Sequence, residues 1–301
     1  MKVLSQTAAG LINLSERLIP SAFVIALILT LFTFGMSLGV AKTSLGDAVK
    51  FWGNGFWELL PFAMQMALII LTGYIVASSA PVAFLLEKIA QLAKGPKSSI
   101  LVMTLASLAL AFFHWGLSMV GSALLVRQMA KRKTGVDYPL LVAAAYLGMG
   151  CTWHAGLSAS APLLVATPGH FLEAKIGVIP TAETIFSSFS LILVGIVTLV
   201  LAFLVPALHP SPEKSRPVNS QLLEAFGGRE CYRLAKPKSW LDWWERTPLL
   251  NLVFGFAAII WLWLRFASSK TSLNIDLLNF IFLFLGLALH SSPQSFWRAA
   301  E

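Results

Sequence analysis

The sequence predicts an all-α integral membrane protein with about six or seven transmembrane spans, one re-entrant hairpin and one broken helix. Of the 301 residues, 57% are hydrophobic and only 12% are charged, whereas a soluble domain carries about 25% charged residues. The apolar residues also form runs of roughly 20 residues, the length that an α-helix needs to cross the hydrocarbon core. Most of the protein surface is therefore expected to face lipid.

Five apolar runs predict plain spans because each meets or approaches this length. The first run is too long for the apolar region of a secretory signal and no small-residue cleavage motif follows it, so it predicts a retained span. An interfacial amphipathic helix is expected near 82–94. The five spans are predicted at 19–40, 57–80, 188–208, 248–266 and 275–290.

Two further apolar stretches, 99–129 and 139–169, are interrupted. Basic clusters flank the first stretch on both sides, and Lys and Arg mark cytoplasmic segments. A single crossing would place one cluster outside, whereas a hairpin with its tip at His114-Trp115-Gly116 keeps both inside. Glycines, serines and prolines interrupt the second stretch too often for a plain span. A non-helical segment at membrane depth must be buried in protein or line a cavity.

The charge distribution predicts a cytoplasmic N-terminus. In this topology the cytoplasmic segments hold most of the 22 Lys and Arg residues. The net charge of +8 is therefore explained by the orientation of the chain in the membrane, and nucleic-acid binding is not predicted. Residues 1–208 would form an N-terminal transmembrane repeat. Residues 209–247, rich in Pro, charge and Trp, would form a cytoplasmic linker, and 248–301 would begin a truncated second repeat.

The hairpin tip is one candidate site, formed by His114, Trp115 and Gly116. Placing an ionisable side chain inside a membrane costs free energy, so such a residue is by default expected to have a function. The alternative is a tilted helix whose histidine binds a neighbouring carbonyl.

The broken segment is the second candidate site. Discontinuous helices direct half-helix N-termini at anionic groups, while their freed carbonyls bind Na⁺ or accept protons. Hydroxyl groups here would complete a carboxylate site or a Na⁺ site near Ser158 and Ser160; the alternative is packing of small residues between helices. No cofactor or metal centre is predicted, because the five histidines are scattered. The candidate residues are Thr152, His154, Ser158, Ser160 and Thr167.

Several segments of the chain form a distinctive combination. They are Trp52-Gly53-Asn54-Gly55-Phe56-Trp57, Gln65-Met66-Ala67-Leu68-Ile69-Ile70 with Thr72-Gly73, Ala77-Ser78-Ser79-Ala80-Pro81, Asp137-Tyr138-Pro139-Leu140-Leu141, Ser158-Ala159-Ser160-Ala161-Pro162-Leu163-Leu164 and Ala166-Thr167-Pro168-Gly169. With these segments the sequence resembles the short-chain fatty acid transporter family over essentially the whole chain.

The resemblance implies a secondary transporter of the bacterial inner membrane, related to the ion transporter superfamily. Its fold pairs two inverted repeats, each with a hairpin and a broken helix, and its carriers often dimerise. The substrate would be a short-chain carboxylate such as butyrate or acetoacetate, moved with H⁺ or Na⁺. Its carboxylate would lie between the hairpin tip and the break.

Two departures from the family pattern bear on this expectation. Relatives tend to carry Asn-Trp-Gly at the tip, where this chain has His114-Trp115-Gly116; an amide suits Na⁺ and a histidine suits a proton. The family also continues into a second half that this sequence lacks. The chain is therefore expected to lack the C-terminal part of the family.

Three alternatives remain at this point. The chain could be a truncated or split-gene fragment without transport of its own, pairing with a separately encoded C-terminal half. It could carry another small carboxylate. A membrane-embedded enzyme would need acid–base or metal groups at one depth, and only His114 and His154 offer them, so no enzyme is predicted.

Overall fold

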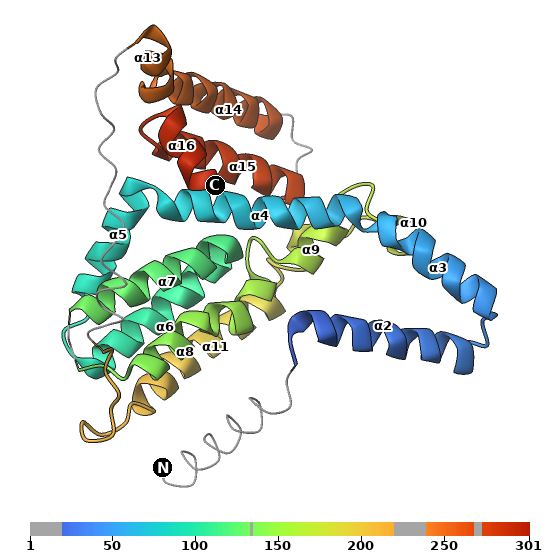
Figure 1. Cartoon of the computed structure of the whole chain (residues 1–301), viewed down its shortest axis with the longest axis horizontal. Coiled ribbons are helices and arrows are strands. Elements are labelled where there is room, and N and C mark those ends of the chain that lie inside the picture. Colours follow the sequence, from blue (N-terminus) through green and yellow to red (C-terminus); the bar gives the residue numbers. More distant parts are fainter. Residues whose placement is uncertain (1–19, 133–134, 220–238, 268–272) are drawn as a thin grey trace. The chain divides into compact units, whose positions relative to one another are not determined.

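The computed structural model describes residues 20–132, 135–219, 239–267 and 273–301 (Figure 1). Within these ranges every regular element is a helix, as predicted. Six helical segments there are long and apolar enough to cross a membrane: Ala22–Gly39, Leu45–Ser78, Pro96–Phe113, Tyr138–Val165, Ser188–Ala207 and Leu249–Ala267. The chain divides into two compact units, Met1–Leu60 and Pro61–Glu301.

The first unit contains helices α2 (Ala22–Gly39) and α3 (Leu45–Glu58). No residue of α2 is buried within the protein, as expected for a helix that contacts lipid. Helix α3 includes Gly53 and Gly55 and lies before the predicted second span. Ser44 caps the helix by accepting a 3.1 Å hydrogen bond from the Asp47 N–H.

The second unit opens with α4 (Leu60–Ser78) and α5 (Ala80–Gln91). Helix α4 covers most of the span predicted at 57–80, and α5 lies where the amphipathic helix was expected. Pro61 lies in the first turn of α4. Backbone N–H groups there make no intrahelical hydrogen bond, so the N–H that proline lacks is not needed.

The predicted hairpin consists of α6 (Pro96–Phe113) and α7 (Trp115–Lys131). His114 alone separates them, with extended backbone angles of φ −162° and ψ 114°. The Ser118 hydroxyl of α7 donates a 3.2 Å hydrogen bond to the Ser107 carbonyl of α6. The two helices therefore run back along each other, as a hairpin requires.

The predicted broken helix is also present. Helix α8 (Tyr138–Cys151) ends before the 3₁₀ turn η1 (Trp153–Ala155), and helix α9 (Ser160–Val165) follows after an irregular stretch. The short elements α10 (Glu173–Ile176) and η2 (Thr181–Glu183) then lead to α11 (Ser188–Ala207). Helices α6, α7, α8 and α11 pack into one bundle (Figure 1).

The C-terminal helices are α13 (Trp240–Arg246), α14 (Leu249–Ala267), α15 (Ile275–Leu289) and α16 (Pro293–Ala300). Helix α13 lies in the predicted linker, of which 220–238 falls outside the described residues. Helix α15 packs on α14 and is joined to α4, since His290 Nε2 lies 3.0 Å from the Ile75 carbonyl oxygen.

Candidate functional site

The hairpin tip and the break in the α8–α9 segment lie against each other. The Trp115 backbone N–H at the tip donates a 2.8 Å hydrogen bond to Ser158 Oγ in the break. The Leu157 N–H donates a 2.6 Å bond to the Phe112 carbonyl. A Cβ on Gly156 would lie 2.4 Å from that same oxygen, so only glycine permits this approach. The two candidate sites of the sequence therefore form one.

Helix α4 crosses the tip where two glycines meet, Gly73 and Gly116. A Cβ on Gly73 would lie 2.5 Å from the carbonyl carbon of Gly116, and a Cβ on Gly116 would lie 2.6 Å from the Ile69 carbonyl oxygen. The two backbones thus touch without intervening side chains, as small residues allow in membrane helix contacts. Gly73 belongs to a segment that carried the family resemblance, but its partner could not be read from the sequence.

His114 is fully buried and caps α7. Its Nδ1 accepts a 3.1 Å hydrogen bond from the Leu117 N–H. Because Nδ1 uses its lone pair, a neutral ring carries its proton on Nε2, which makes Nε2 a donor. The imidazole lies on the ring of Phe282 in α15, with centroids 3.8 Å apart. Phe282 was not predicted as a site residue, because nothing in its own segment marks it.

Three ring nitrogens around the tip are buried and have no hydrogen-bond partner among the described residues. They are Nε2 of His114 and Nε1 of Trp115 and Trp153. The two indole rings meet edge to face with centroids 6.2 Å apart. An indole N–H can only donate, and an ionised carboxylate can only accept. The site thus presents donors that suit an anionic oxygen ligand.

Three predicted hydroxyls instead have partners within the protein. Thr152 donates to the Leu108 carbonyl at 2.9 Å, and Thr167 donates to the Leu163 carbonyl at 2.7 Å. The Ser160 hydroxyl lies 3.2 Å from Met66 Sδ. These contacts hold the broken segment to α6, to itself and to α4.

The remaining predicted residues differ in their placement. Ser158 and Gly116 are buried at the junction, whereas the His154 side chain is exposed. Burial of His114 and exposure of His154 place the two histidines in different environments. No group of three His, Cys, Asp or Glu side chains that could hold a metal ion occurs in the described parts of the chain.

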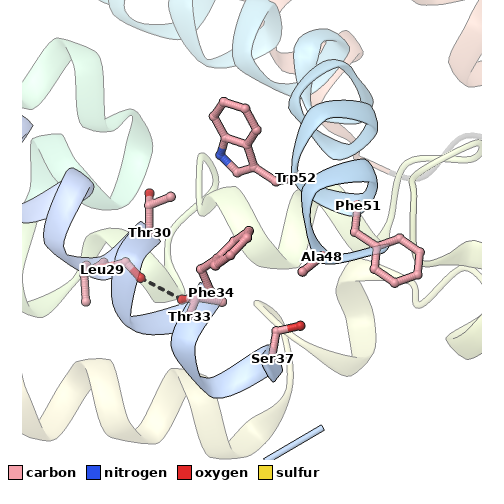
Figure 2. A pocket seen from close by; sticks show the side chains of 8 residues that line it. All are labelled: Leu29, Thr30, Thr33, Phe34, Ser37, Ala48, Phe51 and Trp52. Carbon is pink, nitrogen blue, oxygen red and sulfur yellow. Dashed lines mark hydrogen bonds between the residues drawn. The ribbon is translucent and has the colours of Figure 1, made fainter. Parts of the chain in front are cut away.

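A hollow of about 420 Å³ lies in the first unit between α2 and α3 (Figure 2). The hydroxyls of Thr30 and Thr33 donate to carbonyls of their own helix at 2.8 Å. No basic residue lines this hollow. It therefore offers no evident charge for an anion.

Comparison with known proteins identifies relatives over nearly the whole chain. A family model described as "Short chain fatty acid transporter" matches residues 3–301. A protein of Escherichia coli named "Putative short-chain fatty acid transporter" is 37% identical over 94% of this chain. A protein of Haemophilus influenzae with the same name is 31% identical over 99% of it. No solved structure matches.

The family match does not bear out the prediction that the chain lacks the C-terminal part of the family, because it reaches residue 301. The chain spans 64% of the length of the Escherichia coli relative and 68% of the Haemophilus influenzae relative.

Proposed function

Because the chain belongs to the short chain fatty acid transporter family, we propose that it is a secondary transporter that moves butyrate, acetoacetate or a similar short carboxylate across the bacterial inner membrane by symport with H⁺ or Na⁺. The observation that carries this proposal is the junction of tip and break, where the donors of His114, Trp115 and Trp153 have no partner among the described residues. A carboxylate would accept from these donors.

The surroundings of the tip support a substrate with a short apolar tail. Trp115, Trp153 and Phe282 belong to one apolar cluster, which also includes Ile69 and Leu163. These apolar side chains would bury an alkyl chain favourably, while the ring N–H groups would donate hydrogen bonds to the carboxylate. A dicarboxylate or a sugar would leave polar groups in the cluster without partners, at a cost of about 1–3 kcal/mol for each unsatisfied group.

Alternating access would move the hairpin and broken segment against the plain spans. Such a movement would open the buried tip to substrate from one side of the membrane at a time. Gly73 and Gly116, where α4 crosses the tip in backbone contact, lie at a surface along which the two parts could slide.

The test is uptake of labelled butyrate into vesicles that hold the purified 301-residue chain, with protein-free vesicles measuring passive permeation of the undissociated acid. Trp115→Phe and Trp153→Phe each remove one donor and keep the aromatic ring. Loss of a hydrogen bond to a charged group should weaken apparent affinity about tenfold or more. Trp297→Phe, at an exposed position of α16, is the matched control.

Two alternatives have their own outcomes. Preferential uptake of another small carboxylate would support the same binding site with a different substrate. A chain that inserts and folds but shows no uptake or exchange with any carboxylate would favour a fragment that needs a separately encoded partner. Reading the DNA downstream of the Glu301 codon for a further hairpin segment examines that alternative directly.

A further inference from the structure

A carboxylate, two amides and two helices meet beside the tip. Asp276 stands in the first turn of α15, and its Oδ1 accepts a 2.7 Å hydrogen bond from Gln65 Nε2 of α4. One turn further along α15, Asn279 Nδ2 donates a 3.0 Å bond to the Gln65 backbone carbonyl. We infer that Asp276, Gln65 and Asn279 form the binding site for the cation that is coupled to transport, a proton or a sodium ion; this inference rests on the proposed function.

The first support is a buried oxygen without a donor. Asn279 is 6% exposed, and its Oδ1 has no hydrogen-bond partner among the described residues. The identity of this oxygen is fixed by chemistry, since the other terminal atom faces a carbonyl and must be the amide nitrogen. A buried oxygen acceptor left unpaired is destabilising. It would gain a partner from a sodium ion or from the O–H of a protonated Asp276.

The second support is the charge of Asp276. Asp276 is exposed, and among the described residues its carboxylate accepts the hydrogen bond from the Gln65 amide. The groups that face it from α4 and from its own helix are amides, which do not titrate. An acid in the first turn of a helix is favoured by the helix dipole. That effect alone explains neither the amide bond from α4 nor the unpaired Asn279 oxygen.

The third support is the path from this cluster to the candidate substrate site. The Ile275 N–H, one residue before Asp276, lies 3.4 Å from Thr167 Oγ1 in the broken segment. Phe282, on the same helix, lies on the His114 ring at the tip. Helix α15 therefore contacts both the tip and the broken segment, and packed helices and hydrogen bonds of this kind can carry energetic coupling between two sites.

The proposed transport cycle conserves charge and atoms. If the cation is H⁺, a proton from water on one side forms the O–H bond of Asp276 when the carboxylate substrate binds. The same bond breaks and the proton leaves to water on the other side after the substrate departs. If the cation is Na⁺, the Asp276 carboxylate and the side-chain oxygens of Asn279 and Gln65 are its ligands, and no bond to hydrogen changes.

The experiment separates exchange from accumulation. Vesicles with the wild-type chain are loaded with unlabelled butyrate, and entry of labelled butyrate is measured without any gradient. Accumulation is then measured under a pH gradient and, separately, under a Na⁺ gradient. Asp276→Asn should retain exchange and lose gradient-driven accumulation to the level of protein-free vesicles. Asp276→Glu should restore part of it, and Glu213→Gln, an exposed acid in the predicted linker, should behave like wild type.

The outcomes are distinct. Response to the pH gradient alone identifies a proton, and response to the Na⁺ gradient alone identifies sodium. Undiminished gradient-driven accumulation in Asp276→Asn overturns the cation site while leaving the transporter intact. Absence of exchange in the wild type contradicts the proposed function itself. If Asp276→Asn does not fold, Asn279→Leu takes its place, and accumulation equal to wild type in that variant also overturns the site.

Discussion

The backbone N–H of Trp115 and the hydroxyl oxygen of Ser158 are joined by a 2.8 Å hydrogen bond between residues 43 positions apart in the chain. Trp115 begins α7 at the hairpin tip, and Ser158 lies in the break before α9. Both ends of this bond are buried. One serine hydroxyl therefore fixes the two irregular segments of the fold to each other.

Ser158→Ala should destabilise the protein more than the loss of one hydroxyl would suggest. The Trp115 N–H would remain buried without an acceptor, which costs about 1–3 kcal/mol. Thermal unfolding of the detergent-purified protein measures the effect. Ser160→Ala is the matched control, because Ser160 contacts only the weak acceptor Met66 Sδ. Equal stability of the two variants would show that the tip does not depend on Ser158.

The hairpin and the break could be predicted because each leaves a local mark in the sequence. Basic clusters on both sides of 99–129 excluded a single crossing, and helix-breaking residues crowd 139–169. Helix α3 was not among the predicted spans. Gly53 and Gly55 lie within it, and a glycine costs a helix only about 1 kcal/mol.

The partners of the tip could not be predicted because they depend on packing between distant segments. Phe282 reaches His114 from α15, and no pattern near Phe282 signals that contact. The unpaired state of the indole nitrogens of Trp115 and Trp153 likewise depends on three-dimensional surroundings. The hydroxyls of Thr152 and Thr167 could be selected by residue type, but their bonds to backbone carbonyls became evident only in the structure.

Thr152→Val tests whether that hydroxyl serves the fold or the substrate. Its Oγ1 donates to the Leu108 carbonyl across the α8–α6 contact, and valine keeps the shape while removing the donor. Stability should fall by about 0.5–1.5 kcal/mol, while the apparent affinity for butyrate in the folded protein stays at the wild-type value. A selective loss of affinity without loss of stability would return Thr152 to the binding site.

Gly148→Ala should disrupt the packing of α8 on α6. The added Cβ would lie 2.1 Å from the Ser107 carbonyl oxygen, and overpacking of this kind typically costs about 1–3 kcal/mol. Gly150 in the same helix has no atom within 4 Å of a built Cβ. Gly150→Ala should therefore be neutral or slightly stabilising. Thermal unfolding of both variants checks the contrast, and an unaffected Gly148→Ala would mean that the helices do not cross this closely.

Substitutions of His114 separate its role as a helix cap from its role as a donor. The ring accepts the Leu117 N–H through Nδ1 and offers Nε2 toward the site. His114→Asn keeps a favourable N-cap acceptor but loses the Nε2 donor, so the protein should remain folded and bind butyrate more weakly. His114→Ala removes both functions and should also lose about 1 kcal/mol of stability.

The measurements for His114 are thermal unfolding and the concentration dependence of butyrate exchange, made on all three proteins. If the imidazole acts only as a cap, His114→Asn will match the wild type in both measurements. If it donates to the carboxylate, His114→Asn will match the wild type in stability alone, with affinity reduced about tenfold or more, as for loss of a hydrogen bond to a charged acceptor. Ion dependence, measured in the same vesicles, examines whether the amide shifts coupling from protons to sodium; because the cation site is assigned to Asp276 rather than to the tip, it should stay as in the wild type.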